Sequence, residues 1–214
     1  PEEDVAGGGH AHSGTMIYLG DNWPAKYRGD VFMNNIHGRR INHDRLARKG
    51  SGYTATHAPD VMRAADPWFV GVTLAYGPDG GVYVSDFSDT GECHHTRNTQ
   101  KHTGRIYKIT FGKPKPWKGD IGKLSISELV KLQSHPNEWF ARHARRVLHE
   151  RGNRSLGQAE LTRMLMTGND TISRLRALWT LRCTRGLTAE RLANLLRDQD
   201  EHLRAWAIQL FCEN

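Results

Sequence analysis

The chain of 214 residues lacks long apolar runs, which argues against a membrane-spanning protein. No stretch approaches the roughly 20 consecutive apolar residues that a membrane-spanning helix needs, and no signal peptide is visible at the N-terminus. With 37% hydrophobic and 25% charged residues, the composition is that of an ordinary globular protein. We therefore expect no transmembrane segment and one or two folded domains.

Cysteine is also scarce, since Cys93, Cys183 and Cys212 are too few and too scattered for a disulfide framework. No CxxC pair and no CxxCH motif occurs, which excludes a zinc knuckle of that type and c-type haem attachment within these residues. The GxSxG, P-loop and HExxH motifs are missing as well. The sequence therefore offers no hydrolase or nucleotide-binding signature.

The net charge of +7 lies in one half of the chain. Residues 1–112 contain 12 Lys and Arg against 12 Asp and Glu, whereas residues 113–214 contain 18 against 11. Eight of the twelve histidines fall in the first half. Between the halves, Gly112–Lys123 (GKPKPWKGDIGK) contains prolines that disfavour both helix and strand pairing. We predict an interdomain linker at residues 113–123.

Short apolar segments bounded by glycine or Asp/Asn fill residues 1–112 and predict strands. The five segments are TMIYLG, DVFMNNI, GVTLAYG, GGVYVSDF and GRIYKITF. GPDGG at residues 77–81 predicts a hairpin turn between the third and the fourth. Such an antiparallel meander is typical of β-propeller blades, which have four strands each. We expect a partial β-propeller of about one to two blades, whose other blades lie outside this chain.

Residues 124–214 change to a helical period. The predicted helices form three pairs, 125–135 with 137–152, 156–168 with 170–186, and 187–199 with 201–214. Ala144, Ala177 and Ala207 superpose when the second helices are aligned, at spacings of 33 and 30 residues. This repeat is typical of an α-solenoid of HEAT-like helix pairs. The last pair ends without a polar capping helix, and we expect the natural protein to continue.

Six segments of the chain carry a resemblance to a known family. They are GHAHSGTMIYLGDNWP, YRGDVFMNNIHGRRIN, GSGY, DPWF, YGPDGGVYVSDFSDTGECH and GRIYKITFG. In this order they resemble the C-terminal blades of large planctomycete proteins described as membrane-bound dehydrogenases. The resemblance covers about residues 7–112 and, more loosely, the helical repeats. It implies a β-propeller followed by HEAT-like repeats, usually with a cytochrome c domain, which this chain lacks.

The propeller of that family is in turn similar to quinoprotein sugar dehydrogenases, which oxidise aldoses or related alcohols with pyrroloquinoline quinone and calcium. The resemblance thus implies a sugar or alcohol substrate, electron transfer to the haem domain, and a periplasmic or cell-surface location. In the family pattern an arginine follows DPWF and is a candidate partner for the anionic cofactor. Here that position is Val70, which carries no charge.

Two histidine-containing loops are candidate metal sites. His10 and His12 lie two residues apart before a strand, so that both imidazoles face one side of an extended chain. Asp86–His95 (DFSDTGECHH) supplies carboxylates, which suit calcium, and a thiolate and imidazoles, which suit a transition metal. The alternatives are hydrogen bonds from the histidines to the loop backbone, an Asx-type turn at Asp89, and packing of Cys93 as a small hydrophobic residue.

A third candidate follows the second predicted strand, where NNIHGRRIN contains His37, Arg39 and Arg40. Adjacent arginines suit an anionic substrate or cofactor. The alternative is that they are solvated or paired with carboxylates. For Trp68 and Phe69, packing in the core is favoured over a platform for substrate.

The helical half is rich in arginine. Many of its arginines fall between the apolar positions of the helices, where a solenoid needs charged, solvated residues. The arginines considered are Arg142, Arg145, Arg146, Arg174, Arg176, Arg182 and Arg185. A basic face attracts phosphate, but no recognised motif accompanies it. We therefore do not expect nucleic-acid binding.

Two functions follow from these observations. The first is a fragment of a quinoprotein-like dehydrogenase, inactive by itself because most of the propeller is missing. Its metal, cofactor or substrate site would be lined by His10, His12, His37, Asp86, Cys93 and His94, with Arg39 and Arg40 as cofactor-binding residues. The alternative is a non-catalytic scaffold that holds a partner protein or a polysaccharide, which Val70 favours. Convergence of the histidine loops would favour the first function.

Overall fold

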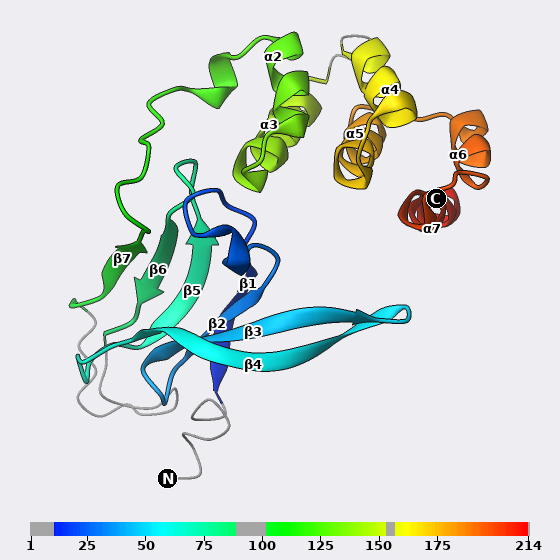
Figure 1. Cartoon of the computed structure of the whole chain (residues 1–214). Coiled ribbons are helices and arrows are strands. Elements are labelled where there is room, and N and C mark those ends of the chain that lie inside the picture. Colours follow the sequence, from blue (N-terminus) through cyan, green and yellow to red (C-terminus); the bar gives the residue numbers. More distant parts are fainter. Residues whose placement is uncertain (1–10, 89–101, 153–156, 214) are drawn as a thin grey trace. The chain divides into compact units, whose positions relative to one another are not determined.

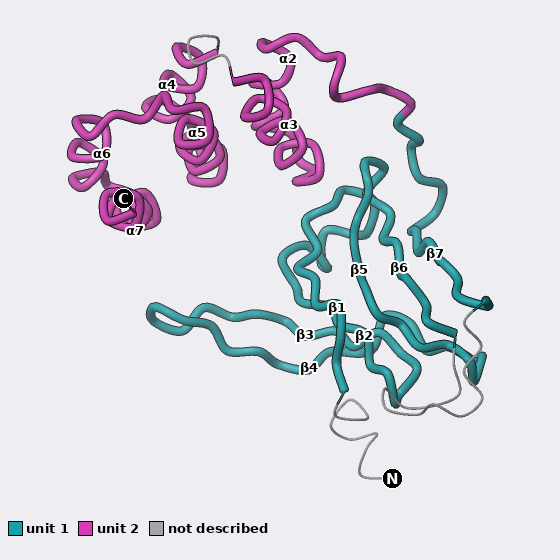
Figure 2. The backbone as a smooth tube through the Cα atoms, turned by 180° about the vertical axis from the view of Figure 1, so that it is seen from behind, with its two compact units in different colours: residues 1–117 teal, residues 118–214 magenta. Residues whose placement is uncertain are grey.

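The computed structural model describes residues 11–88, 102–152 and 157–213, and the chain divides into two compact units (Figures 1 and 2). Unit 1 comprises residues 1–117 and unit 2 residues 118–214. The division falls inside the predicted linker at residues 113–123. Strands build unit 1 and helices build unit 2. No helix in the described part of the chain combines the length and the apolar character of a membrane span.

Unit 1 contains two antiparallel sheets, each a meander of strands that are consecutive in the chain. The four-stranded sheet has the order β1-β2-β3-β4, with β1 His12–Ile17, β2 Val31–Asn35, β3 Arg40–Lys49 and β4 Gly52–Arg63. The three-stranded sheet has the order β5-β6-β7, with β5 Gly71–Tyr76, β6 Val82–Asp86 and β7 Arg105–Ile109. A short 3-10 helix, η1 Ala25–Tyr27, precedes β2. All five predicted strand segments contain a strand.

Strands β3 and β4 were not predicted. They extend from the sheet as a two-stranded ribbon, whose residues 47–57 are exposed on both faces (Figure 1). Because both faces of the ribbon contact water, the sequence has no apolar-polar alternation there. The available signals were the glycines at 50 and 52 and the β-branched Thr54 and Thr56.

The two sheets pack against each other through β1, β2 and β5. Their facing side chains form one core, which consists of Met16, Tyr18, Trp23, Phe32, Ile41, Phe69, Leu74, Val82 and Val84. Alternation along β6 buries Val82 and Val84 and leaves Tyr83 partly exposed. The core thus lies between the sheets, as in other two-layer β structures.

Tyr18 joins the two sheets through its fully buried hydroxyl. The hydroxyl donates to the carbonyl of Gly80 at 2.8 Å and accepts from the N–H groups of Asn22 and Trp23 at 2.9 and 2.8 Å. Gly80 belongs to the predicted 77–81 turn and has a φ of 74°. Burial raises the pKa of the Tyr18 phenol above its ordinary value. The un-ionised phenol therefore bonds one end of the core to the turn between β5 and β6.

Replacement of this hydroxyl gives the first prediction. Tyr18→Phe leaves one carbonyl and two N–H groups without their buried partner, so we expect a loss of about 2–3 kcal/mol in the free energy of unfolding. The pKa of Tyr18 is higher in the folded than in the unfolded chain, so above pH about 10 the phenol of the unfolded chain ionises before that of the folded chain. The stability difference between wild type and Tyr18→Phe is therefore full below pH about 10 and becomes smaller above it. Urea unfolding at pH 7 and pH 11 measures both effects. The control is Tyr53→Phe on the exposed ribbon, where no change is expected; equal losses in the two variants would contradict the role of Tyr18.

Unit 2 consists of six α-helices in the part that the structure describes. They are α2 Ile126–Lys131, α3 Glu138–Glu150, α4 Gln158–Thr167, α5 Thr171–Cys183, α6 Ala189–Leu195 and α7 Glu201–Cys212, with 3-10 turns η2 Ile121–Lys123 and η3 Leu132–Ser134. Consecutive helices pack as α2 with α3, α4 with α5, and α6 with α7. The second helices also contact one another, α3 with α5 and α5 with α7. These pairs match the three predicted pairs in order.

Polar caps fix where these helices begin. Ser125 forms a capping box with Glu128, and the side chain of Asp170 accepts the N–H of Ser173. The aligned alanines Ala144, Ala177 and Ala207 are all fully buried, as small residues at the contacts between second helices.

Three of the helical arginines are mostly buried and not solvated. Arg176 is 4% exposed and donates to Glu138, and Arg174 is paired with Asp198. Arg145 is mostly buried. For Arg174 and Arg176 only tertiary structure reveals this, because their partners Asp198 and Glu138 are 24 and 38 residues away in the sequence.

The Arg174–Asp198 pair gives the second prediction. Its two hydrogen bonds, 3.1 and 2.5 Å long, join α5 to the segment before α7 and hold the pKa of Asp198 below its ordinary value. Asp198→Asn is expected to lower the free energy of unfolding by about 1–2 kcal/mol at pH 7. The contribution is present above pH about 4 and is lost as pH falls through the lowered folded-state pKa.

Unfolding of the wild type and of Asp198→Asn at pH 7 and pH 3 measures this difference. The control Glu150→Gln removes one member of an exposed pair with Arg146 and is expected to change stability by less than 1 kcal/mol, roughly. A difference between wild type and Asp198→Asn that is unchanged at pH 3 would contradict the ionic origin.

Candidate functional site

The register of the strands brings the predicted site loops to one end of unit 1. In the first sheet Asn35 pairs with both His12 and Arg40, and in the second sheet Asp86 pairs with both Gly71 and Arg105. The hydroxyl of Ser13 in β1 donates to the carbonyl of Gly71 in β5 at 3.0 Å and thereby connects the two sheets. We call this the loop end, formed by residues 11–12, 36–40, 63–71, 86–88 and 102–105 (Figure 1).

Five of the predicted site residues lie at the loop end. They are His12, His37, Arg39, Arg40 and Asp86. The other three, His10, Cys93 and His94, lie outside the described residues, as do Asp89, Glu92 and His95. Within the described residues, no group of three or more His, Cys, Asp or Glu side chains is arranged to hold a metal ion.

Asp86 is committed to protein donors. Its Oδ1 accepts the N–H groups of Val70 and Ser88 at 2.8 and 2.9 Å, and its Oδ2 accepts the guanidinium of Arg105 at 2.8 Å. The side chain is fully buried. Asp86 therefore fixes the start of β5 and the end of β6 in place.

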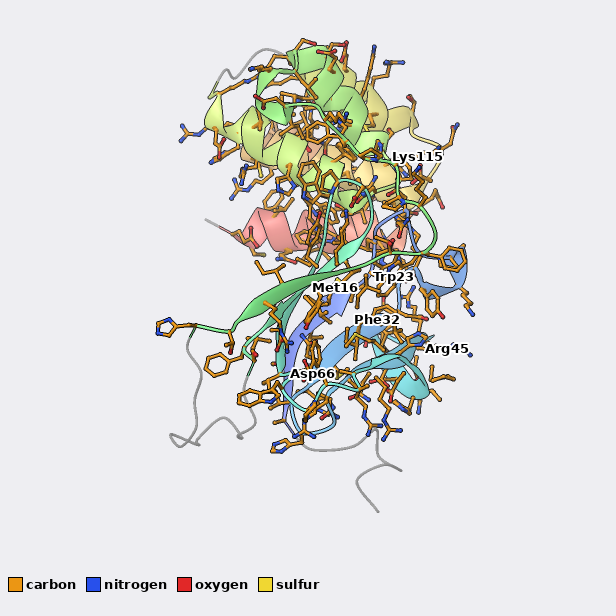
Figure 3. All side chains as sticks on the ribbon, turned by 90° about the vertical axis from the view of Figure 1, so that its left-hand side faces the viewer. Met16, Trp23, Phe32, Arg45, Asp66 and Lys115 are labelled. Atoms are coloured by element: carbon orange, nitrogen blue, oxygen red, sulfur yellow. The ribbon has the colours of Figure 1, made fainter. Side chains whose placement is uncertain are left out.

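Arg105 extends this network to the DPWF motif. Its Nη1 donates to Asp66 at 2.6 Å, and the other oxygen of Asp66 accepts the N–H of Trp68 at 2.8 Å. These two donors, Trp68 first, hold the pKa of the Asp66 carboxyl below its ordinary value. Figure 3 shows Asp66 at the loop end, beyond the core residues Met16 and Phe32. Phe69 is buried in the core, as predicted, whereas Trp68 is half-buried.

A second network at the loop end centres on Asp60, which the sequence did not single out. Asn42 donates to Asp60 Oδ1 at 2.8 Å, and Arg40 donates to Oδ2 at 3.1 Å. A ring nitrogen of His12 lies 3.1 Å from Asn42 Oδ1, which also accepts the amide of Asn35 at 2.9 Å. Buried Arg40 thus fulfils the alternative expectation of pairing with a carboxylate.

Two histidine–aspartate pairs lie along the four-stranded sheet. His43 is buried, contacts Asp30 at 2.8 Å and stacks on Phe32. His57 is 45% exposed and lies 3.1 Å from Asp44. The pairs join residues 13 apart that register brings together, so no local sequence pattern identifies them.

Arg39 differs from Arg40 in its environment. It is half-buried and has a left-handed backbone with a φ of 48°. Its carbonyl accepts the N–H of Ala64 at 2.9 Å, but its side chain makes no hydrogen bond or ion pair with the described residues. Its charge acts on Asp66, whose pKa it helps to lower. Arg39 is therefore the predicted cofactor-binding residue that retains capacity for an anionic or hydroxyl-rich ligand.

The described residues fit the implied groups only in part. A metal centre does not fit them, because Asp86 is bound to N–H donors and no three His, Cys, Asp or Glu side chains among the described residues are arranged to hold an ion. For an anionic quinone cofactor, Arg39 offers one cationic contact, while Arg40 is already paired. We therefore derive no reaction step through either group.

The geometry of Asp86 gives the third prediction. Asp86→Asn places an amide against Arg105 and removes the charge that Arg105 needs, so we expect a loss of about 3 kcal/mol in the free energy of unfolding. Since Asp86 binds protein donors, any metal that the purified chain carries is expected to remain at the wild-type stoichiometry. Urea unfolding and inductively coupled plasma mass spectrometry measure the two quantities.

Two further variants complete this experiment. Asp44→Asn, in a partly exposed pair, is the stability control and is expected to cost less than 1 kcal/mol, roughly. His94→Ala tests the loop-ligand hypothesis directly by metal content. Loss of a stoichiometric metal in Asp86→Asn, with the fold intact, would contradict the structural role of Asp86.

Residues 2–112 match a family described as a domain of unknown function, DUF7133. No curated protein and no solved structure matches the chain significantly. The match covers more than half of the 214 residues and ends before the helices of unit 2.

Proposed function

Since this chain belongs to the DUF7133 family, whose function is unassigned, we propose that it is a part of a β-propeller followed by HEAT-like repeats, from a quinoprotein-like dehydrogenase that oxidises a sugar or an alcohol. The loop end of unit 1 is proposed to contribute to the substrate site. The resemblance to planctomycete membrane-bound dehydrogenases suggests this reaction, and it also suggests a periplasmic or cell-surface location.

One observation carries the proposal: the two meanders of unit 1 begin at the same end and pack face to face. Their first strands, β1 and β5, contact each other. Propeller blades are antiparallel sheets repeated around a central axis, and adjacent blades pack by their faces. On this hypothesis β1–β4 form one blade and β5–β7 three strands of the next. The paired helices of unit 2 agree with HEAT-like repeats in order and in the contacts between second helices.

The chemistry of the loop end suits a hydroxyl-rich ligand. Asp66, with 38% of its side chain exposed, offers carboxylate lone pairs that accept from hydroxyl groups. Arg39 offers N–H donors, and half-buried Trp68 offers an aromatic surface. A carboxylate, a guanidinium and an indole together match the polar edges and apolar face of a sugar ring.

In the whole protein these residues would bind and orient the substrate. The pKa of Asp66 is lowered by the N–H of Trp68 and by Arg105, so its carboxylate stays ionised to lower pH than an ordinary aspartate and is able to accept hydrogen bonds from substrate hydroxyls. The isolated chain is expected to bind such ligands without oxidising them.

The fourth prediction is binding of aldoses or polyols at the loop end. Titration of the isotope-labelled chain with a panel of aldoses and polyols is expected to shift the indole N–H signal of Trp68 and the backbone signals of residues 36–40 and 63–71. Arg39→Gln is expected to weaken binding about tenfold, because a charge-assisted hydrogen bond is lost. The matched control Arg48→Gln, on the exposed ribbon, is expected to bind as the wild type does.

Two outcomes would contradict this proposal. One is the absence of any shift at the loop end with every sugar and alcohol in the panel. The other is equal affinity in Arg39→Gln and Arg48→Gln.

A second candidate function is a non-catalytic scaffold for a protein or polysaccharide partner, and Val70 favours it. The side chain of Val70 is buried and its N–H is bound to Asp86, so the position after DPWF supports the fold and offers no charge to a cofactor. Pull-down of a specific partner by the chain, together with no sugar binding at the loop end, would favour the scaffold.

A further inference from the structure

The β3–β4 ribbon concentrates positive charge within the first half of the chain. Its residues 45–57 contain Arg45, Arg48 and Lys49 and no acidic residue. Because residues 1–112 contain 12 Lys and Arg against 12 Asp and Glu, the rest of this segment contains 9 against 12. The ribbon is therefore a basic projection from an otherwise acidic segment (Figure 1).

One edge of the ribbon has no partner strand in the described part of the chain. Strand β2 pairs with β3 only from Arg40 to Asp44, whereas β4 pairs with β3 as far as Lys49. On the side away from β4, residues 45–49 form no backbone hydrogen bond with the described residues. In an antiparallel ladder every other residue directs its N–H and C=O away from its partner strand. We call residues 45–49 the free edge of β3, since these groups are open to an added strand.

Two exposed cations lie on one face of the free edge. Arg45 and Lys49 are four residues apart in a strand, so their side chains point to the same face about 13 Å apart. Both are exposed, and neither side chain makes a hydrogen bond or an ion pair with the described residues. Arg48 points to the other face, and its Nε donates to the carbonyl of Gly50 in the turn at 3.1 Å. Arg45 and Lys49 are therefore open to an anionic partner on that face.

The charges make the free edge selective. Lysine and arginine at a strand edge oppose the addition of another basic strand, because like charges on adjacent strands repel each other. The same side chains form favourable cross-strand pairs with an acidic strand. The free edge therefore disfavours a second copy of the ribbon and attracts an acidic segment.

We propose that the free edge of β3 binds an extended acidic segment of a partner protein by strand addition. The backbone of the segment pairs with the outward N–H and C=O groups of β3, and its acidic side chains lie opposite Arg45 and Lys49. An alternating sequence suits this edge, because acidic residues at every second position point to the face of the two cations. A third strand also stabilises a two-stranded ribbon, which is marginal in water by itself. The inference uses the ribbon alone and does not depend on the dehydrogenase proposal.

Phosphate polymers share the negative charge of such a segment, but the observations favour a peptide. The free edge presents backbone donors and acceptors in alternation, and a polypeptide strand supplies both at the same spacing. A phosphodiester backbone offers acceptors alone, so it would leave the outward carbonyls of β3 without a partner.

The fifth prediction uses fluorescence anisotropy of a fluorescein-labelled octapeptide of alternating Glu and Val with the whole 214-residue chain at low salt. The wild type is expected to bind. The double variant Arg45→Gln/Lys49→Gln is expected to bind about tenfold more weakly, because two cross-strand charge pairs are lost. The matched control Lys113→Gln/Lys115→Gln removes two exposed cations from the same unit and is expected to bind as the wild type does.

Two modified peptides separate strand addition from simple charge attraction. One is N-methylated on its valines and the other on its glutamates, so each keeps all its charges and lacks the N–H groups of one edge. One of the two is expected to bind at least about tenfold more weakly than the unmodified peptide, and the other to bind well. In the isotope-labelled chain, amide protons within residues 45–49 are expected to exchange more slowly with solvent when the unmodified peptide is bound.

Circular dichroism of each variant separates loss of binding from loss of fold. The proposal would be overturned by no binding to the wild type, or by equal affinities of the double variant and its control. Unchanged affinity of both N-methylated peptides would also overturn it, because charge alone would then explain the binding. So would tighter binding of a labelled oligothymidylate that depends on Arg45 and Lys49, which would identify a phosphate polymer as the partner.

Discussion

Burial of one face of each sheet against the other is the constraint on which unit 1 depends. Each meander has an apolar face that must be covered, and each sheet covers the apolar face of the other. The fully buried hydroxyl of Tyr18 fixes the distance between the sheets at one end, and the bond from Ser13 to Gly71 connects them at the other. All loops that carry candidate site residues emerge from this fixed frame.

Charge compensation is the second constraint, and it separates structural residues from functional candidates. At the loop end Asp86 and Asp60 are saturated by arginine and backbone or amide donors, so they support the frame. Arg39 at the loop end is a half-buried cation whose side chain makes no hydrogen bond or ion pair with the described residues. Since a half-buried cation is costly without an anion or hydrogen-bond acceptor, this position is where a ligand is proposed.

Much of the fold could be predicted from the sequence because it is encoded locally. The five apolar strands, the 77–81 turn and the six helices follow from periodicity and from caps such as Ser125 and Asp170. The β3–β4 ribbon could not be predicted, because strands with two exposed faces carry no apolar alternation. The loop end was predicted in part: His12 and Asp86, predicted as metal ligands, and Arg40, predicted as a cofactor-binding residue, lie there and take part in hydrogen-bond networks within the protein.

The sequence by itself determined the strand-rich and helical halves, the linker between them and the residue types available at the loops. Each of these depends on neighbours within a few positions, through period, turn chemistry and capping. Tertiary structure alone decided which charges are satisfied. Asp66 meets Arg105 across 39 residues and Arg176 meets Glu138 across 38, and each pair forms only when the strands of unit 1 or the helices of unit 2 are in place. Ion pairing depends on distances of a few ångströms between side chains, and only the folded backbone sets those distances.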